Sequence, residues 1–270
     1  MAAMKILGIL NITADSFSDG GKYLAPQAAL AHAQTLADDG ADIIDIGAAS
    51  SNPDAGAVAP EVEIVRLASV IPALKAKGLS LSVDSFAPDV QRWALEQGVD
   101  YLNDIHGFSE PALYPVLAAS PAKLIVMHAI QARGIATRED VPPEAIMDRI
   151  NVFFDARLAA LESAGIARVR LILDPGMGFF LGTNPQTSLT VLERLPELKS
   201  RYGLPLLVSV SRKSFLRTLV DNDETWLESM GAATEGMAVH RGGADYIRTH
   251  APAALRDGLK GLEGLEKTGR

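Results

Sequence analysis

The chain has 270 residues, of which 48% are hydrophobic, and it contains no cysteine. This composition predicts a folded protein and excludes disulfides, thiolate catalysis and zinc–thiolate sites. The formal net charge of −8 argues against broad binding to nucleic acid or to an anionic membrane surface. No apolar run approaches the roughly 18 residues of a membrane-spanning helix, and no signal peptide is recognisable. We therefore expect a soluble, cytoplasmic protein whose partners are small molecules.

Short apolar runs that are typical of strands alternate with longer stretches of helical periodicity. The expected strands, in chain order, are residues 5–10, 42–46, 79–83, 100–102, 123–127, 170–173, 206–210 and 245–248. The expected helices are residues 28–37, 61–77, a helix that ends at 97, 112–119, 143–164, 187–201, 226–241 and a last helix that ends near 267. The nearly continuous apolar strands indicate burial on both faces, as in a parallel sheet.

The number of repeats favours one closed barrel. Eight strand–helix pairs suggest an α/β fold of the (β/α)8 TIM-barrel type, formed as a single domain over residues 1–270. An open sheet with extra helices is the alternative that this pattern leaves. No interdomain linker and no low-complexity segment interrupts the chain.

Every expected strand is followed by residues that can form hydrogen bonds or carry charge. In a barrel of this kind, the loops after the strands build the active site. These residues, from the first strand to the eighth, are Asn11, Thr13 and Asp15; Ser50, Ser51 and Asn52; Asp84 and Ser85; Asn103 and Asp104; His128; Asp174; Ser211, Arg212, Lys213 and Ser214; and Arg248, Thr249 and His250. Because they come from all eight strand ends, they predict one polar pocket at the mouth of the barrel.

Several of these residues also have purely structural explanations. Asp84 and Asp174 could cap the helices that follow them, and Asn103 could be a turn residue. Arg212 and Lys213 could belong to a solvated helix start. His128 could be a buried histidine that supports its neighbours, and His250 could also be structural. The convergence of lysine, arginine, asparagine and carboxylates on one mouth favours the functional interpretation, because helix caps alone do not require these residue types.

The deep part of the pocket offers acceptors and an amide from three separate strand ends. Asp84, Asn103 and Asp174 could read the edge of a planar heterocycle that carries several N–H groups, because buried polar edges need matched partners. The sequence has no Ser–His–Asp arrangement, P-loop or glycine-rich dinucleotide turn. A triad hydrolase, a P-loop ATPase and a Rossmann dehydrogenase are therefore disfavoured.

The last two strand ends supply three groups that can be cationic. Lys213, Arg248 and His250 follow the seventh and eighth strands, where many barrels bind phosphate. Asn11, with Asp15 nearby, could place a Mg²⁺ that bridges phosphate oxygens. Cations and a metal ion beside a diphosphate would stabilise its negative charge as it leaves the substrate.

The ordered set of motifs closely resembles the dihydropteroate synthase family. The segments that carry the resemblance are residues 8–21, 40–47, 82–85, 103–105, 174–176, 211–214 and 248–250. They keep their order from residue 5 to about residue 260, so the resemblance covers nearly the whole chain. It implies a transferase of folate biosynthesis that joins 4-aminobenzoate to (7,8-dihydropterin-6-yl)methyl diphosphate and releases 7,8-dihydropteroate and pyrophosphate.

The resemblance also implies roles for residues of this chain. It assigns the pterin to Asp84, Asn103, Asp174 and Lys213, the diphosphate to Arg248 and His250, and Mg²⁺ to Asn11. It adds four residues to those that would bind substrate, namely Ser51, Phe179, Phe180 and Ser214. The catalytic residues that it implies are Lys213, Arg248 and His250. The implied mechanism is ionisation to a resonance-stabilised cation followed by attack of the aniline nitrogen, which needs no side-chain nucleophile.

Two segments depart from the common pattern of the family. Where many members read Gly-Glu-Ser-Thr-Arg-Pro-Gly after the second strand, residues 48–54 read Ala-Ala-Ser-Ser-Asn-Pro-Asp, so Asn52 replaces an arginine. Where many members have Gly-Phe-Gly after the sixth strand, residues 178–182 read Gly-Phe-Phe-Leu-Gly. Both features resemble the acquired, sulfonamide-insensitive members. We therefore expect the pair Phe179 and Phe180 to narrow the aminobenzoate pocket against bulkier sulfonamides.

Two other functions fit parts of the same pattern. A pterin-binding methyltransferase domain is similar in barrel and pterin pocket, but it would not need the cations of residues 211–214 and 248–250. A non-catalytic pterin-binding paralogue would explain the arginine lost at Asn52. The family resemblance further implies a homodimer, with the last helices as candidates for the contact.

Overall fold

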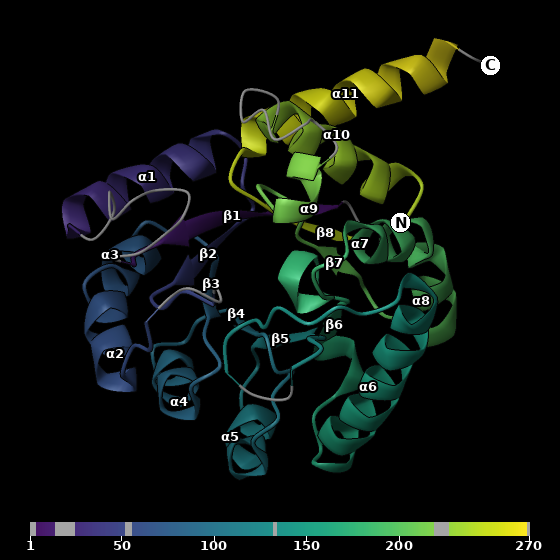
Figure 1. Cartoon of the computed structure of the whole chain (residues 1–270). Coiled ribbons are helices and arrows are strands. Elements are labelled where there is room, and N and C mark those ends of the chain that lie inside the picture. Colours follow the sequence, from purple (N-terminus) through teal and green to yellow (C-terminus); the bar gives the residue numbers. More distant parts are fainter. Residues whose placement is uncertain (1–3, 14–24, 52–55, 132–133, 219–226, 269–270) are drawn as a thin grey trace.

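The structure is a computed structural model that describes residues 4–13, 25–51, 56–131, 134–218 and 227–268. Within these residues, parallel strands form one sheet in the order β6-β5-β4-β3-β2-β1-β8-β7. The strands are β1 (Lys5–Asn11), β2 (Ile43–Gly47), β3 (Leu81–Asp84), β4 (Tyr101–Asp104), β5 (Lys123–Met127), β6 (Leu171–Asp174), β7 (Leu207–Val208) and β8 (Tyr246–Thr249). A parallel bridge from Leu173 to Leu206 brings β6 beside β7 and closes the ring. The predicted (β/α)8 barrel is confirmed (Figure 1).

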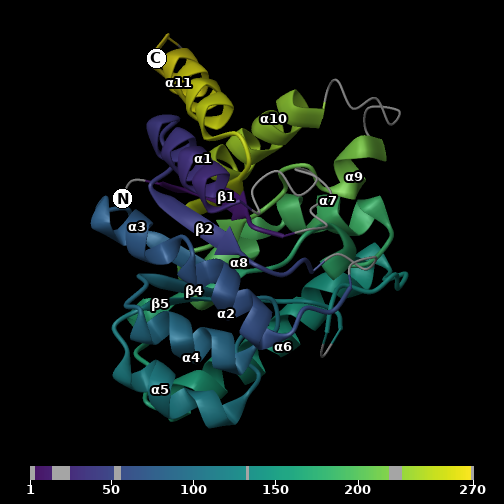
Figure 2. The same cartoon turned by 90° about the vertical axis from the view of Figure 1, so that its left-hand side faces the viewer.

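Helices surround the strands on the outside of the barrel (Figure 1, Figure 2). They are α1 (Pro26–Asp38), α2 (Pro60–Ala68), α3 (Ile71–Ala76), α4 (Pro88–Glu96), α5 (Tyr114–Ala119), α6 (Pro143–Ser163), α7 (Pro185–Glu193), α8 (Leu195–Tyr202), α9 (Ser214–Arg217), α10 (Leu227–His240) and α11 (Pro252–Thr268). Short 3₁₀ turns lie at Pro111–Leu113, Arg168–Arg170 and Gly178–Phe180. Many of the helices begin at a proline, whose fixed φ and missing N–H suit the first helical position.

The structure corrects two of the expected helices. The helix predicted over residues 61–77 is divided into α2 and α3, and the one predicted over 187–201 is divided into α7 and α8. Each break comes just before a proline, Pro72 or Pro196, which is the second residue of the later helix. A proline lacks the N–H for the helical hydrogen bond, and its ring clashes with the carbonyl four residues earlier. The seventh strand is also shorter than predicted, because the chain turns away after Val208.

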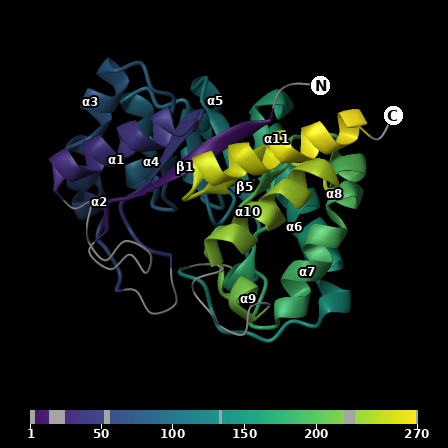
Figure 3. The same ribbon diagram turned by 90° about the horizontal axis from the view of Figure 1, so that it is seen from above.

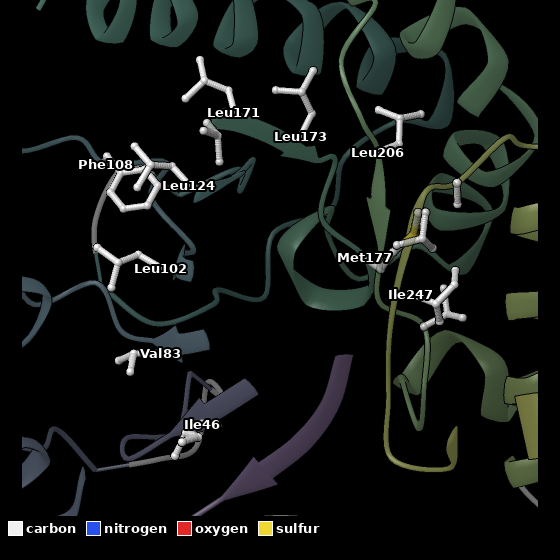
Figure 4. Packing of buried hydrophobic residues seen from close by; sticks show 14 of the residues in the cluster. Ile46, Val83, Leu102, Phe108, Leu124, Leu171, Leu173, Met177, Leu206 and Ile247 are labelled. Atoms are coloured by element: carbon white, nitrogen blue, oxygen red, sulfur yellow. The ribbon is translucent and has the colours of Figure 1, made fainter. Parts of the chain in front are cut away.

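The main core lies between the strands and the helices. Outward-facing strand residues pack there against the buried faces of the helices, as Figure 4 shows for Ile46, Val83, Leu102, Leu124 and Ile247. At the C-terminal end of the chain, α10 and α11 lie side by side and α11 reaches β1 (Figure 3). No helix among the described residues is long and apolar enough to cross a membrane.

A second apolar layer fills the barrel interior near the N-terminal ends of the strands. Its members are Leu7, Ile43, Tyr101, Ile125, Ile172, Leu207 and Tyr246. The Tyr101 and Tyr246 rings meet edge to face, with their centroids 6.3 Å apart. This layer of packed side chains fills the barrel interior on the side away from the C-terminal ends of the strands, where barrels of this kind carry their active sites.

Candidate functional site

Polar side chains line the inner face of the barrel between the apolar layer and the C-terminal ends of the strands. Side chains alternate along a strand, so residues two apart share a face. Two residues after apolar-layer positions on β2, β4, β6 and β8 stand Asp45, Asn103, Asp174 and Arg248, all on the inner face. The strand periodicity therefore brings these four side chains together above the apolar layer. Asp84, at the end of β3, joins them.

Arg248 is the centre of this group. Its Nε donates to Asp45 Oδ2 at 2.5 Å, and its Nη2 donates to Asp84 Oδ2 at 2.8 Å. The Asp45 side chain is fully buried, and only 14% of the Arg248 side chain is exposed. Arg248 thus joins β8 to β2 and β3 across the barrel. A charge-assisted pair of this kind orients both partners, because an unpaired buried charge would be costly.

Two carboxyls of this group have pKa values that burial raises towards neutral pH. Burial raises the pKa of Asp84 to about 7, although Arg248 acts to lower it. Burial also raises the pKa of Asp174 to about 6, and there the N–H of Gly176, 2.8 Å from Oδ1, acts to lower it. Both carboxyls can therefore accept hydrogen bonds from a ligand, and N–H donors of that ligand would favour the ionised form.

Several buried polar atoms in this part of the barrel have no hydrogen-bond partner within the described structure. They include Asn103 Oδ1, Asp45 Oδ1, Ser82 Oγ and Thr13 Oγ1. Buried polar atoms are nearly always satisfied in native proteins, by protein, water or ligand. Asn103 is 3% exposed and sits between Asp84 and Asp174 in strand order, so its free carbonyl oxygen indicates a polar ligand in this pocket.

Lys213 comes from the turn after β7, immediately before α9. Its Nζ lies 5.0 Å from the centre of the Phe180 ring, so the cation faces the aromatic ring. Burial and the neighbouring Arg248 lower the pKa of Lys213 to about 8, while Asp174 and Asp84 act to raise it. Lys213 therefore remains largely protonated at neutral pH and belongs electrostatically to the same group as the carboxyls. Ser214 follows it as the first residue of α9 and is half-buried.

His250 lies just after β8 and contacts the same turn. Its Nδ1 is 3.0 Å from Ser211 Oγ, and its backbone N–H donates to that oxygen at 3.2 Å. Burial and the cations of Arg212, Arg248 and Lys213 lower its pKa well below the ordinary value. The ring is therefore neutral at pH 7 and acts as a hydrogen-bonding group, so the prediction of a cation at His250 is wrong.

An apolar cluster lines one side of the mouth. It contains Ile105, Met127, Ala129, Ala136 and Phe180, with Phe86 and Phe179 packed against it. Phe180 is only 6% exposed, and its carbonyl accepts the N–H of Ile130 at 3.0 Å. Ala136 donates its N–H to the carbonyl of Ser51 at 3.1 Å. The loop after β5 thus connects the Ser51 segment with the Phe179–Phe180 turn.

Asn11, the candidate metal ligand, is the last residue of β1. A Cβ on Gly47 would lie 3.5 Å from Asn11 Oδ1 and 4.0 Å from Asp84 Cβ, so these two side chains flank the same glycine. Asp15 and Asn52 lie outside the described residues. Within the described ranges, no group of three or more His, Cys, Asp and Glu side chains is arranged to hold a metal ion.

His128 is a buried residue behind the pocket wall. It is 2% exposed, its Nδ1 lies 3.0 Å from the carbonyl oxygen of Pro175, and its ring meets Phe153 edge to face. Burial lowers its pKa to about 4, so it is neutral. His128 therefore supports the turn that follows Asp174.

The Asp104 side chain holds the backbone of the loop that follows β4. It accepts hydrogen bonds from the N–H of His106, the N–H of Phe108 and the Gln91 amide at 2.7–3.0 Å. Its carboxylate is thus occupied by protein donors, and the strand end that carries Asn103 is held in place.

Sequence reasoning missed Asp45 as a site residue. The signal was present, because Asp45 is a carboxylate in the middle of an otherwise apolar strand, Ile43–Gly47. Glu63 was missed for a different reason. It lies on the inner face of α2 and accepts the Ser85 hydroxyl at 2.9 Å, and nothing in the helical pattern distinguishes it from a solvated acid.

Comparisons with known proteins agree with this geometry. The family model described as "Pterin binding enzyme" matches residues 7–250. The chain is similar to the dihydropteroate synthase type-2 of Escherichia coli, with 57% identity over 267 residues that cover 98% of this chain and 97% of that protein.

Two solved structures are similar over their whole length. The dihydropteroate synthase of Xanthomonas albilineans with 4-aminobenzoic acid has a TM-score of 0.87 and 34% identity, and the match covers 98% of this chain and 94% of that one. The synthase of Yersinia pestis in a sulfonamide drug complex has a TM-score of 0.85 and 32% identity, and the match covers 99% and 95%. The chain is thus a member of the pterin binding enzymes and belongs to the dihydropteroate synthase family.

Proposed function

We propose that this protein is a transferase of folate biosynthesis that condenses 4-aminobenzoate with (7,8-dihydropterin-6-yl)methyl diphosphate. The observation that carries the proposal is the set of buried acceptors above the apolar layer. Asn103 Oδ1 has no hydrogen-bond partner among the described residues, and the carboxyls of Asp84 and Asp174, at the ends of β3 and β6, have raised pKa values. A pterin edge carries several N–H donors, and it would satisfy these acceptors together.

The cationic side of the pocket would serve the diphosphate. Lys213 and Arg248 supply positive charge close to the same carboxyls, and the neutral His250 offers a hydrogen-bonding nitrogen. As the C–O bond to the diphosphate breaks, its electron pair leaves with pyrophosphate, and nearby cations would stabilise that anion. The aniline nitrogen then forms the new C–N bond and loses a proton.

The residues present fit a bound Mg²⁺. The Asn11 carboxamide oxygen is a hard oxygen donor of the kind that this ion accepts, and Asn11 ends β1 opposite Gly47 of β2. Asn11 would hold the ion, with substrate phosphate oxygens and water as the remaining ligands. When bound, the ion neutralises charge on the leaving diphosphate.

Release of pyrophosphate tests the proposed reaction against its alternatives. Purified protein mixed with Mg²⁺, the pterin diphosphate and 4-aminobenzoate should release pyrophosphate and form 7,8-dihydropteroate. A non-catalytic pterin-binding paralogue would bind the pterin and release none. A methyltransferase domain would instead use a methylated folate as methyl donor, and such an activity would contradict the proposal.

We also infer that the enzyme discriminates against sulfonamides. The support is that Ser51 and the Phe179–Phe180 turn, which belong to the two departures from the common family pattern, are joined through the loop after β5. The Phe180 side chain is buried in the apolar cluster, and Lys213 Nζ lies over its ring. The carbonyl of Phe180 accepts a hydrogen bond from the Ile130 N–H, so the ring forms a rigid wall. A rigid wall can reject a ligand that is bulkier at the end opposite its amine while it accepts 4-aminobenzoate.

Inhibition constants of the purified enzyme test this inference. Phe180→Ala should lower the sulfonamide inhibition constant by about tenfold or more, because removing a steric block is worth about 1–3 kcal/mol. Trp93→Leu, which alters a partly buried aromatic residue of α4 outside the apolar cluster, is the control and should change the inhibition constant little. Sulfonamide sensitivity of the unmodified enzyme equal to that of the Yersinia pestis synthase would contradict the inference.

The remaining expectations concern assembly and location. We propose a homodimer in the cytoplasm, in line with the family resemblance. Sedimentation of the purified protein would show a single species of twice the chain mass, and a monomer at micromolar concentration would contradict the dimer.

A further inference from the structure

Helix α4 carries a glutamine on the face that it buries. Gln91 lies on this face with Val90 and Ala94, and it is 1% exposed. Glutamine is mostly a surface residue, because burial of its amide costs free energy unless protein hydrogen bonds replace those to water. Its two neighbours on this face are apolar, so a glutamine at this position needs specific hydrogen-bond partners.

The Gln91 amide bridges the two strand ends that carry Asp84 and Asn103. Its Nε2 donates to the carbonyl oxygen of Ser85 at 2.7 Å and to Oδ2 of Asp104 at 2.8 Å. Ser85 directly follows Asp84, and Asp104 directly follows Asn103. The amide nitrogen has two hydrogens, so each of them holds one strand end.

The bridge lies where the backbone pairing of β3 with β4 ends. The paired register stops with Asp84 opposite Asn103, and the Ser85 N–H then donates to the Asn103 carbonyl at 3.1 Å. From there, Ser85 leads towards α4 and Asp104 leads into the loop after β4. Because the two segments diverge at this point, side-chain contacts must fix their separation, and Gln91 contacts both.

A ring contact joins the same two segments at the mouth of the barrel. Phe86 follows Ser85, His106 lies two residues after Asp104, and the centroids of the two rings are 4.8 Å apart. Phe86 also packs against the apolar cluster that lines the mouth. The ends of β3 and β4 are thus linked by the two rings at the mouth and by Gln91 on the side of α4.

We propose that Gln91 is a positioning residue that sets the separation of Asp84 and Asn103 and thereby the affinity of the pocket for a pterin. It acts from the helix side, through Ser85 and Asp104. A rigid heterocycle that bonds to both Asp84 and Asn103 needs their acceptor atoms at a fixed spacing, because hydrogen bonds weaken steeply when their geometry departs from the optimum. The inference rests on the proposed function, because the pterin belongs to that reaction.

Gln91→Met tests the proposal, because it keeps the approximate size of the side chain and removes both N–H donors. The Kd for 6-hydroxymethyl-7,8-dihydropterin, which lacks the diphosphate, should rise about tenfold in calorimetric titrations. In turnover, the KM for the pterin diphosphate should rise similarly while kcat stays within about threefold, because the lost interaction supports the bound substrate and the transition state alike. The KM for 4-aminobenzoate should change little.

Two controls separate positioning from stability. Gln34→Met makes the same substitution on α1, where the glutamine also donates to an aspartate, Asp38. Leu198→Ala, at a buried position on α8, should lower the melting temperature without altering the ends of β3 and β4. Neither control should change the Kd for the dihydropterin. A rise in Kd in Leu198→Ala equal to that in Gln91→Met would overturn the proposal, because loss of stability alone would then explain it.

Gln91→Asn keeps the test decisive if Gln91→Met does not fold. It retains an amide that is one methylene shorter and cannot hold both acceptors, so the Kd for the dihydropterin should rise by about threefold or more. An unchanged Kd in a folded variant, or an equal loss of affinity for 4-aminobenzoate, would overturn the proposal. Binding of the dihydropterin to the unmodified protein is measured first. Its absence would contradict the proposed function, whereas binding that these variants do not weaken would contradict only the role of Gln91.

Discussion

At the scale of single residues, the pocket consists of side chains whose chemistry the sequence could predict and whose pairing it could not. Asp84, Asn103 and Asp174 follow directly from strand order, because parallel strands end at the same edge. The choice of Arg248 as the partner of Asp45 and Asp84 depends on positions more than 160 residues apart in the chain. No local pattern encodes that contact.

The role of Lys213 gives the first prediction. Lys213→Ala should reduce kcat/KM by about a hundredfold or more, because it removes a cation that lies among the carboxyls and near the proposed leaving group. The melting temperature should change by only a few degrees. Lys260→Ala, which removes an exposed lysine paired with Asp257 on α11, is the matched control. A fully active Lys213→Ala enzyme would contradict the assigned role.

The carboxyl of Asp174 gives a prediction for the pH dependence of stability. Its pKa is raised from 3.8 to about 6 in the folded chain, so between these values the folded state holds a proton that the unfolded state has released. The corresponding stability is present below about pH 4 and is lost as the pH rises to about 6. Denaturant titrations should show a smaller decline over this range in Asp174→Asn. Equal slopes for the variant and the unmodified protein would refute the raised pKa.

At the scale of elements, the sequence predicted the strands well and the helix boundaries less well. Apolar runs locate strands because both faces of the sheet are buried. The breaks at Pro72 and Pro196 were missed because helical periodicity continues across them. The loop after β5 was not predicted at all, since its contacts with Ser51 and Phe180 depend on the closed barrel.

The turn after β6 requires a glycine at residue 176. Gly176 has a φ of +77°, and a Cβ there would lie 2.4 Å from the carbonyl oxygen of His128. Gly176→Ala should therefore lower the free energy of unfolding by about 1–3 kcal/mol. It should also weaken pterin binding, because the Gly176 N–H holds Asp174. Gly203 also has a positive φ, but nothing lies within 4 Å of the position of its Cβ. Gly203→Ala therefore measures the backbone strain alone, and the difference between the two variants measures the steric clash at Gly176. Equal effects of the two substitutions would contradict this account.

At the scale of the whole molecule, the sequence predicted both eight strands and a closed ring, and the structure shows which residues close it. The bridge between Leu173 and Leu206 completes the barrel, and one apolar layer fills it. We expect a single domain that unfolds in one cooperative transition by calorimetry, because all the strands except β3 contribute a side chain to this layer. Ile172→Ala, in that layer, should lower the stability by about 2–5 kcal/mol and shift the whole transition. Two separate transitions would contradict the single domain.

The central claim is that the pocket above this layer joins a pterin to 4-aminobenzoate with loss of pyrophosphate. The most direct test counts both products from the purified enzyme with Mg²⁺ and the two substrates. The account predicts one pyrophosphate for each 7,8-dihydropteroate, and loss of both products in Lys213→Ala. A folded protein that binds the pterin diphosphate but releases no pyrophosphate when 4-aminobenzoate is added would contradict it.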